Sequence, residues 1–144
     1  MTDELIFCVV ADWQIPDNNL TRLVEKLIQE KPAFVVITGD LVMANGSDSA
    51  PWNAFFDRIQ PLVETGIPIH AVPGNHDLDG DVLAARREWN KRLELQSPGL
   101  FYSFDAGEAH FIGLCIPPST HSVLHEKFNL PEGEMTQLEW FARD

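Results

Sequence analysis

Short apolar segments alternate with helical patterns over the first half of this 144-residue chain. Three of these segments are rich in the branched and aromatic residues that are typical of buried strands, and they span residues 5–11, 34–38 and 68–73. Between them, apolar residues recur at helical spacing over 20–28 and again over 52–63. This order predicts a βαβαβ unit, in which crossover helices return the chain to the same end of a parallel sheet.

The second half of the chain has a different pattern. A third helix is predicted over about residues 81–95, and residues 100–116 are interpreted as two strands joined in a hairpin. The segment Pro117–Pro131 is interpreted as a loop, because it combines prolines, histidines and small polar residues. A last helix is predicted from near Glu134–Thr136 through Phe141. Together these features predict an α/β fold with a mixed sheet flanked by helices.

Each of the three predicted strands ends in residues with polar side chains. Asp12 follows the first strand, Gly39-Asp40 follows the second, and Gly74-Asn75-His76-Asp77 follows the third. In an open α/β sheet, ligands bind at the carboxyl ends of the strands, so these side chains are expected to converge. One such residue alone is typical of an ordinary turn, whereas three successive strand ends with similar chemistry predict a site.

Oxygen ligands of this kind suit divalent cations. Asp40 is the expected bridge between two ions, because it follows the middle strand in sequence. Asn75 offers a neutral oxygen, whereas its neighbour His76 is expected to face a substrate and to stabilise negative charge or protonate a leaving oxygen. Asp77 is expected to orient the His76 ring.

Charge and composition limit the classes of partner. The chain carries 22 acidic and 10 basic residues, a formal net charge of -12, which disfavours direct binding to nucleic acid or to an anionic membrane. A 44% hydrophobic content at this length predicts one domain with a substantial core. No apolar stretch approaches the ~20 residues needed to cross a bilayer, and the acidic N-terminus does not resemble a signal peptide, so a cytoplasmic location is expected.

Cys8 and Cys115 are interpreted as buried thiols, because both lie inside apolar runs. His70 and His110 lie within strand patterns and are interpreted as structural residues.

The three strand-end motifs resemble the first three sequence blocks of the calcineurin-like metallophosphoesterase superfamily, in its branch of purple acid phosphatases and cyclic-nucleotide phosphodiesterases. Residues 102–114 are also similar to the purple acid phosphatases, and Gln137–Phe141 resembles the helix that follows. The resemblance implies a four-layer α/β/β/α sandwich, with residues 1–144 as the N-terminal portion of one phosphoesterase domain. We therefore expect a truncated domain, whose second sheet a missing C-terminal half or a partner in an oligomer would complete.

Residue by residue, the resemblance implies a site for two divalent ions, such as Mn, Fe or Zn. Asp12 would bind the first ion, Asp40 would bridge both, and Asn75 would bind the second. His76 would assist at the leaving group or at a phosphoryl oxygen. The implied reaction is hydrolysis of a phosphomonoester or phosphodiester by in-line attack of a metal-bound hydroxide.

Departures from the family pattern leave a second function open. The first block reads Asp12-Trp13-Gln14 where the family usually has Asp-x-His, so that Gln14 is a weaker, neutral candidate ligand. Met43 stands where purple acid phosphatases place a tyrosine, and His121 and His125 are expected to be exposed loop residues rather than the family's later histidine ligands. The alternative is a degenerate or incomplete phosphoesterase fold that acts as a binding module without turnover. A receiver-like or dinucleotide-binding domain is disfavoured, because no Gly-x-Gly-x-x-Gly follows the first strand.

Overall fold

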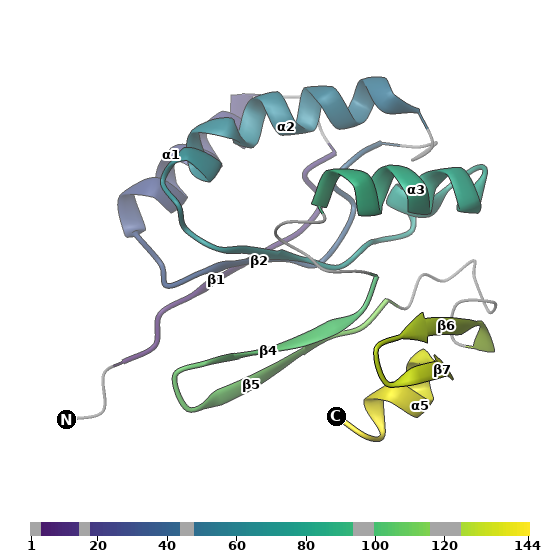
Figure 1. Cartoon of the computed structure of the whole chain (residues 1–144). Helices are drawn as coiled ribbons and strands as arrows, with labels where there is room; N and C mark the ends of the chain where they lie inside the picture. The colour runs from purple at the N-terminus through teal and green to yellow at the C-terminus, as the bar shows by residue number, and fades with distance from the viewer. Residues whose placement is uncertain (1–3, 15–17, 44–47, 94–99, 116–124) are drawn as a thin grey trace.

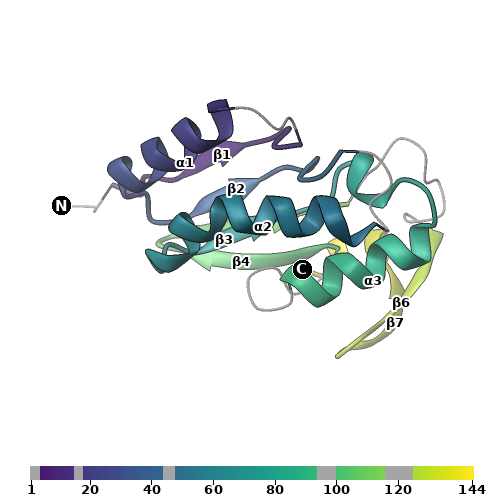
Figure 2. The same cartoon turned by 90° about the horizontal axis from the view of Figure 1, so that it is seen from above.

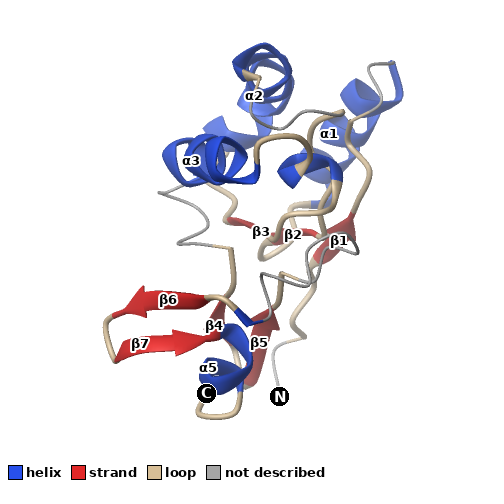
Figure 3. Ribbon diagram, turned by 90° about the vertical axis from the view of Figure 1, so that its right-hand side faces the viewer, coloured by secondary structure: helices blue, strands red, loops and turns tan. Residues whose placement is uncertain are grey.

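The chain forms layers around a small parallel sheet (Figure 1). A computed structural model describes residues 4–14, 18–43, 48–93, 100–115 and 125–144. Three helices, α1 (Asn18–Glu30), α2 (Ser49–Glu64) and α3 (Val82–Leu93), lie on one face of the sheet, and a hairpin lies on the other face (Figure 3). None of the helices in the described ranges is long and apolar enough to span a membrane.

The central sheet contains the strands β1 (Cys8–Val10), β2 (Val35–Ile37) and β3 (Ile69–Ala71), paired in that order and all parallel. The predicted α/β class and βαβαβ order are confirmed. Each strand has only three residues, and antiparallel pairing among the described residues is confined to two separate hairpins. Because side chains alternate across a strand, one residue of each strand forms a row on the face away from the helices. The paired register places Val9, Val36 and His70 in this row.

The helices bury the opposite face of the sheet. In α2 the apolar positions at helical spacing are buried, and Asp48 caps the helix by accepting a hydrogen bond from the N–H of Ala50 (3.1 Å). Seen from above, α1 lies over the β1 side of the sheet and α2 over the β3 side (Figure 2). Trp52 of α2 meets Trp89 of α3 edge to face, with 5.8 Å between ring centroids, so the predicted third helix joins the same core.

The strands β4 (Tyr102–Ala106) and β5 (Ala109–Gly113) form the predicted hairpin. The Tyr102 hydroxyl donates a hydrogen bond to the carbonyl of Ala71 in β3 (3.1 Å). The ring of Phe104 stacks on His70, with 3.6 Å between centroids and 5° between planes. These two contacts hold the hairpin against the face of the sheet that the helices leave open.

The C-terminal region contains a second hairpin, formed by β6 (Lys127–Leu130) and β7 (Gly133–Thr136). The prediction of a loop across Pro117–Pro131 is therefore wrong for residues 127–130, whereas residues 116–124 lie outside the described part of the chain. The strand forms because half-buried Phe128 and Leu130 alternate with exposed polar neighbours, a period of two that suits a surface hairpin. Its inner side packs on the core through Phe128, whose ring lies 5.1 Å from that of Phe101.

The helix α5 (Gln137–Phe141) follows β7 directly, as predicted from the region of Glu134–Thr136. It starts with a capping box, in which Thr136 and Glu139 satisfy each other's backbone N–H groups. Gln137 is fully buried, where its side chain accepts from the N–H of Cys115 (2.8 Å) and donates to the Cys115 carbonyl (3.0 Å). Cys115 is a buried free thiol as expected, whereas Cys8 is also free but only partly buried.

Candidate functional site

The loops that follow β1 and β2 hold two aspartates in an unusual backbone conformation. Asp12 has a φ of 57° and Asp40 a φ of 56°, in the left-handed region that most L-residues avoid. The N–H of Asp12 donates to the carbonyl of Gly39 (3.2 Å), and the N–H of Gln14 donates to the carbonyl of Asp40 (3.1 Å). Strained residues of this kind cluster at functional sites, where neighbouring structure maintains them.

Glycines allow the loops after β2 and β3 to approach closely. A Cβ on Gly39 would lie 2.5 Å from the backbone N of Gly74, and one on Gly74 would lie 2.2 Å from Oδ1 of Asp40. Gly39 also has a φ of 106°, which only glycine adopts readily. The glycines of the second and third motifs are thus explained by this close contact between two strand ends.

Asp77 joins the same two loops. Its carboxylate is completely buried and accepts four backbone hydrogen bonds, from Asp40, Leu41, Val42 and Gly74, at 2.8 to 3.1 Å. Burial raises the pKa of the Asp77 carboxyl to about 6, against the effect of the four N–H donors, which favour the ionised form. The expectation that Asp77 orients the His76 ring is wrong, because both oxygens of the carboxylate accept hydrogen bonds from these backbone N–H groups.

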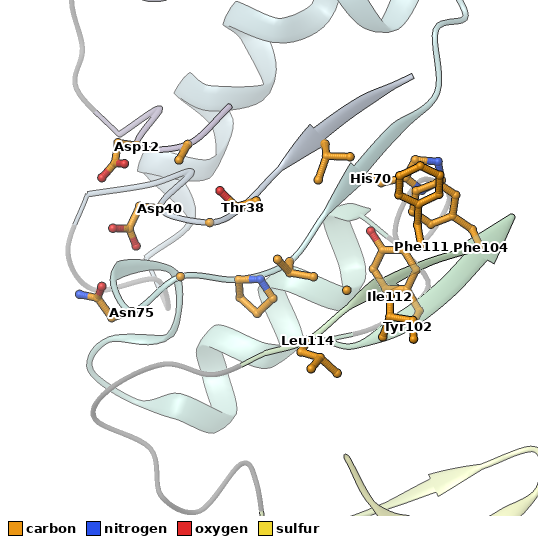
Figure 4. Close-up of a pocket in the computed structure, with 17 residues that line it drawn as sticks. Asp12, Thr38, Asp40, His70, Asn75, Tyr102, Phe104, Phe111, Ile112 and Leu114 are labelled. Carbon is orange, nitrogen blue, oxygen red and sulfur yellow. The ribbon is translucent and has the colours of Figure 1, made fainter. Parts of the chain in front are cut away.

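The three strand ends open into one cavity of about 500 Å³. Asp12, Asp40 and Asn75 all line it, as predicted, and lie together at one end (Figure 4). At the other end are the aromatic residues Tyr102, Phe104 and Phe111 of the hairpin with His70 of β3 (Figure 4). His70 thus contributes to the cavity wall as well as to packing. Burial lowers its pKa and favours the neutral ring.

The oxygen atoms at the polar end are open to a ligand. Oδ1 of Asp40 accepts a hydrogen bond from the N–H of His76 (3.0 Å), which leaves Oδ2 without a hydrogen-bond partner among the described residues. The side chains of Asp12 and Asn75 make no hydrogen bond within the same set of residues. Two carboxylates and one amide are the kind of donor that divalent cations prefer, so these residues fit the metal that the family resemblance implies. A cluster of three or more His, Cys, Asp or Glu suited to a metal does not occur within the described ranges.

The other two predicted site residues lie apart from this cavity wall. Gln14 lines a second cavity of about 420 Å³ with Trp13, Met43 and residues of α2, and its Oε1 is buried without a hydrogen-bond partner in the described part of the chain. His76 begins the short 3₁₀ helix η1 (His76–Leu78) and is not among the residues that line either cavity. Its Nδ1 lies 3.5 Å from Oδ2 of Asp79, which permits an ion pair with a protonated ring, although the geometry is not that of a hydrogen bond.

The remaining histidines lie elsewhere. His110 is exposed on β5 and interacts with Asp105 and Asp144, consistent with a structural role. His125 is exposed, and His121 lies outside the described residues. Sequence reasoning missed the cavity position of His70. The available signal was its place between Ile69 and Ala71, because neighbouring residues of a strand point to opposite faces of the sheet.

Three curated proteins illustrate the similarity of this chain to others. Purple acid phosphatase 23 of Arabidopsis thaliana is 25% identical over 127 residues, covering 67% of this chain and 28% of the relative. Probable inactive purple acid phosphatase 28 of the same plant is 37% identical over 62 residues, covering 42% of this chain and 15% of the relative. An uncharacterized protein of Schizosaccharomyces pombe is 37% identical over 90 residues, covering 62% of this chain and 17% of the relative. The chain thus spans less than a third of the length of each of these relatives.

A match to a whole family is more extensive than any of these pairwise similarities. The sequence matches the calcineurin-like phosphoesterase family over residues 5–143, which includes all three strand-end motifs and both hairpins. The parallel sheet with its helices is consistent with the first half of that fold. The chain therefore belongs to the calcineurin-like phosphoesterase family.

Proposed function

We propose that this chain carries part of the active site of a metal-dependent phosphoesterase that hydrolyses a phosphomonoester or phosphodiester. One observation carries the proposal: Asp12, Asp40 and Asn75 line one cavity at the carboxyl ends of parallel strands. Each of them has a side-chain oxygen that accepts no hydrogen bond from a described residue. The name of one similar protein, purple acid phosphatase 23 of Arabidopsis thaliana, agrees with this chemistry.

In this proposal Asp12, Asp40 and Asn75 hold one or two divalent ions such as Mn²⁺, Fe or Zn²⁺. Bound ions supply Lewis-acid stabilisation of the negative charge on a transferring phosphoryl group. The N–H of His76 donates a hydrogen bond to Oδ1 of Asp40, which leaves Oδ2 as the oxygen available to an ion. The His76 ring, one residue from Asn75, would donate a proton or a hydrogen bond to a phosphoryl or leaving oxygen.

The test is Mn²⁺ binding and hydrolysis of p-nitrophenyl phosphate and bis(p-nitrophenyl) phosphate by the chain and its variants. Asp40→Asn should weaken Mn²⁺ binding at least tenfold, because a bridging carboxylate loses its charge. His76→Ala should retain Mn²⁺ but lower turnover by about 10² to 10⁴, the usual contribution of a general acid. Asp57→Asn, which removes one exposed charge from α2, should alter neither property. The enzyme proposal is wrong if hydrolysis persists unchanged in both Asp40→Asn and His76→Ala.

A binding module without turnover is the second candidate. Gln14 lines the second cavity rather than the one that contains Asp12, so the first block offers one fewer ligand than the Asp-x-His of the family. Two of the similar Arabidopsis proteins are named probable inactive purple acid phosphatases. Mn²⁺ binding that Asp40→Asn removes, without hydrolysis of either nitrophenyl ester, would favour this candidate over the enzyme.

A further inference from the structure

Asp77 is a buried carboxylate that accepts four hydrogen bonds from the described residues, all of them from the backbone of two neighbouring loops. Oδ2 accepts from the N–H of Asp40 and from the N–H of Gly74, each at 2.8 Å. Oδ1 accepts from Leu41 (2.8 Å) and Val42 (3.1 Å). One oxygen therefore connects the loop after β2 to the loop after β3, and the other secures the turn that follows Asp40.

A reciprocal hydrogen bond completes this connection. Oδ1 of Asp40 accepts a hydrogen bond from the N–H of His76 (3.0 Å). His76 is the residue directly before Asp77, whose carboxylate in turn accepts from the N–H of Asp40. Each aspartate thus fixes the backbone beside the other. The two loops are held at the separation that Gly39 and Gly74 permit, and Asn75 lies between the fixed positions 74 and 76.

The conformation of Asp40 depends on this arrangement. Three successive N–H groups, of residues 40–42, point at one carboxylate, and this kind of concave backbone arrangement forms where left-handed and right-handed residues adjoin. Asp40 is the left-handed residue, with its φ of 56°. Charge-assisted hydrogen bonds to backbone N–H groups are stronger than neutral ones, so they can offset the strain.

We propose that Asp77 is a positioning residue, which touches neither metal nor substrate but holds Asp40 and Asn75 in the geometry that binds the metal. The metal-binding part of this inference rests on the function proposed above. Loss of the Asp77 carboxylate should release both loops, and the oxygen atoms of Asp40 and Asn75 should then lose their common orientation toward the cavity.

The test uses Asp77→Asn, which keeps the shape of the side chain but replaces one acceptor oxygen with an amide group that faces N–H donors. Hydrogen–deuterium exchange should show at least tenfold faster exchange in peptides that cover residues 40–42 and 74, with little change in α2. Mn²⁺ affinity, measured by calorimetry, should fall at least tenfold. Asp57→Asn makes the same change of charge on the exposed face of α2 and should leave both measurements unchanged.

The possible outcomes separate this inference from the proposed function. Equal acceleration of exchange across the whole chain would show a general loss of stability and overturn the positioning role. Locally faster exchange with unchanged Mn²⁺ affinity would also overturn it, because the loops would then move without any effect on the metal. If the unmodified chain binds no Mn²⁺, the proposed function fails, while the exchange pattern still decides whether Asp77 holds the loops. If Asp77→Asn does not fold, Asp77→Glu keeps the charge but displaces the oxygens by one methylene, and the same two measurements apply to it.

Discussion

Asp12 and Asp40 combine two properties at single positions. Each has a left-handed backbone, and each places its side chain in the cavity at the strand ends. Aspartate and asparagine adopt that backbone conformation more readily than other non-glycine residues. Substitution by alanine would therefore remove a carboxylate proposed to bind the metal and add backbone strain together. Asparagine is the sharper substitution at both positions, because it tolerates the backbone and changes mainly the charge.

Gly74→Ala should distort the site through a steric effect alone. The new methyl group would lie 2.2 Å from Oδ1 of Asp40 and 2.6 Å from its backbone N, so that one loop has to move. We expect the free energy of unfolding to fall by about 1–3 kcal/mol, as overpacking usually does, and Mn²⁺ affinity to fall at least tenfold. Urea unfolding and calorimetry measure the two effects.

Gly66→Ala is the matched control for this prediction. Gly66 has a φ of 75°, and a Cβ there meets nothing within 4 Å. Backbone strain of about 1–2 kcal/mol should therefore lower stability by a similar amount, without any effect on Mn²⁺ affinity. Equal losses of affinity in both alanine variants would show that the site responds to global stability and not to the contact with Asp40.

At this scale the sequence predicted the residues that line the cavity better than the residues that hold them in place. The convergence of Asp12, Asp40 and Asn75 could be predicted because each is a polar residue that follows a strand of one parallel sheet. The role of Asp77 could not, because its four donors lie up to 37 residues away and depend on how two loops meet. The burial of Gln137 was equally hidden, since it follows from the position of the Cys115 backbone.

The hairpin β4–β5 is connected to the end of α5 by a cluster of exposed polar residues. His110 faces two carboxylates, with Nδ1 2.6 Å from Asp105 and Nε2 2.8 Å from Asp144, and the Ser103 hydroxyl donates to Asp144 (2.7 Å). Both ring nitrogens can donate only when the ring is protonated. Hydrogen bonds to Asp144 and then Asp105 therefore raise the pKa of His110, and the same contact with His110 lowers the pKa of Asp144.

The stabilisation from this cluster should depend on pH. Because the folded pKa of His110 exceeds its unfolded value, its contribution is complete below the ordinary value of 6.5 and disappears as pH rises through the folded value. The contribution of Asp144 is present above the ordinary value of 3.8 and disappears as pH falls through its lowered folded value. We expect a decrease in Tm on the order of a few degrees between pH 5.5 and pH 9, because exposed ion pairs contribute little.

An NMR titration of the histidine ring signals measures this effect directly, and thermal unfolding measures its consequence. His110→Gln should remove the part of the pH dependence that comes from this cluster and leave the hairpin intact. A midpoint for His110 at or below the value of an unfolded peptide would contradict the interaction.

Prediction of the elements succeeded where a long periodic pattern existed. The helices α1, α2 and α3 and the hairpin β4–β5 lie where hydrophobic periodicity and turn residues placed them. The strands of the parallel sheet are shorter than their apolar runs, because the ends of those runs turn into the site loops and the crossovers. The hairpin β6–β7 was missed because each strand has four residues with mixed polarity, a pattern that local sequence cannot distinguish from a loop.

On the scale of the whole molecule, aromatic side chains fill the space between the parallel sheet and the hairpin β4–β5. Phe34 lies at the centre of this layer, with the rings of Phe7, Phe104 and Phe111 at centroid distances of 4.9 to 5.3 Å. The layer is incomplete near β1, where Val9 is 58% exposed and Ile6 is 59% exposed. The sequence predicted that a second sheet would lie against the first, but the extent to which the hairpin covers β3 depends on long-range packing of Tyr102 and Phe104.

Because of the charge of the whole chain, the proposed metal binding should contribute to stability as well as to chemistry. At a net charge of -12, acidic groups repel one another in the folded state, and two of them, Asp12 and Asp40, line one cavity. A ligand that binds only the folded state at 100 times its Kd adds about 2.7 kcal/mol, which corresponds to an increase in Tm of roughly 8–12 °C for a chain of this length. Differential scanning calorimetry with Mn²⁺ should show this increase.

Screening of charge and specific binding can be separated by matched conditions. NaCl at the same ionic strength as the Mn²⁺ solution should raise the Tm by much less, because it screens the exposed charges without occupying the site. Asp57→Asn should keep the full response to Mn²⁺, whereas Asp40→Asn should lose most of it, although both remove one negative charge. If NaCl reproduces the increase, or if Asp40→Asn keeps it, the stabilisation comes from the general acidity of the chain and the cavity at the strand ends is not where the metal binds.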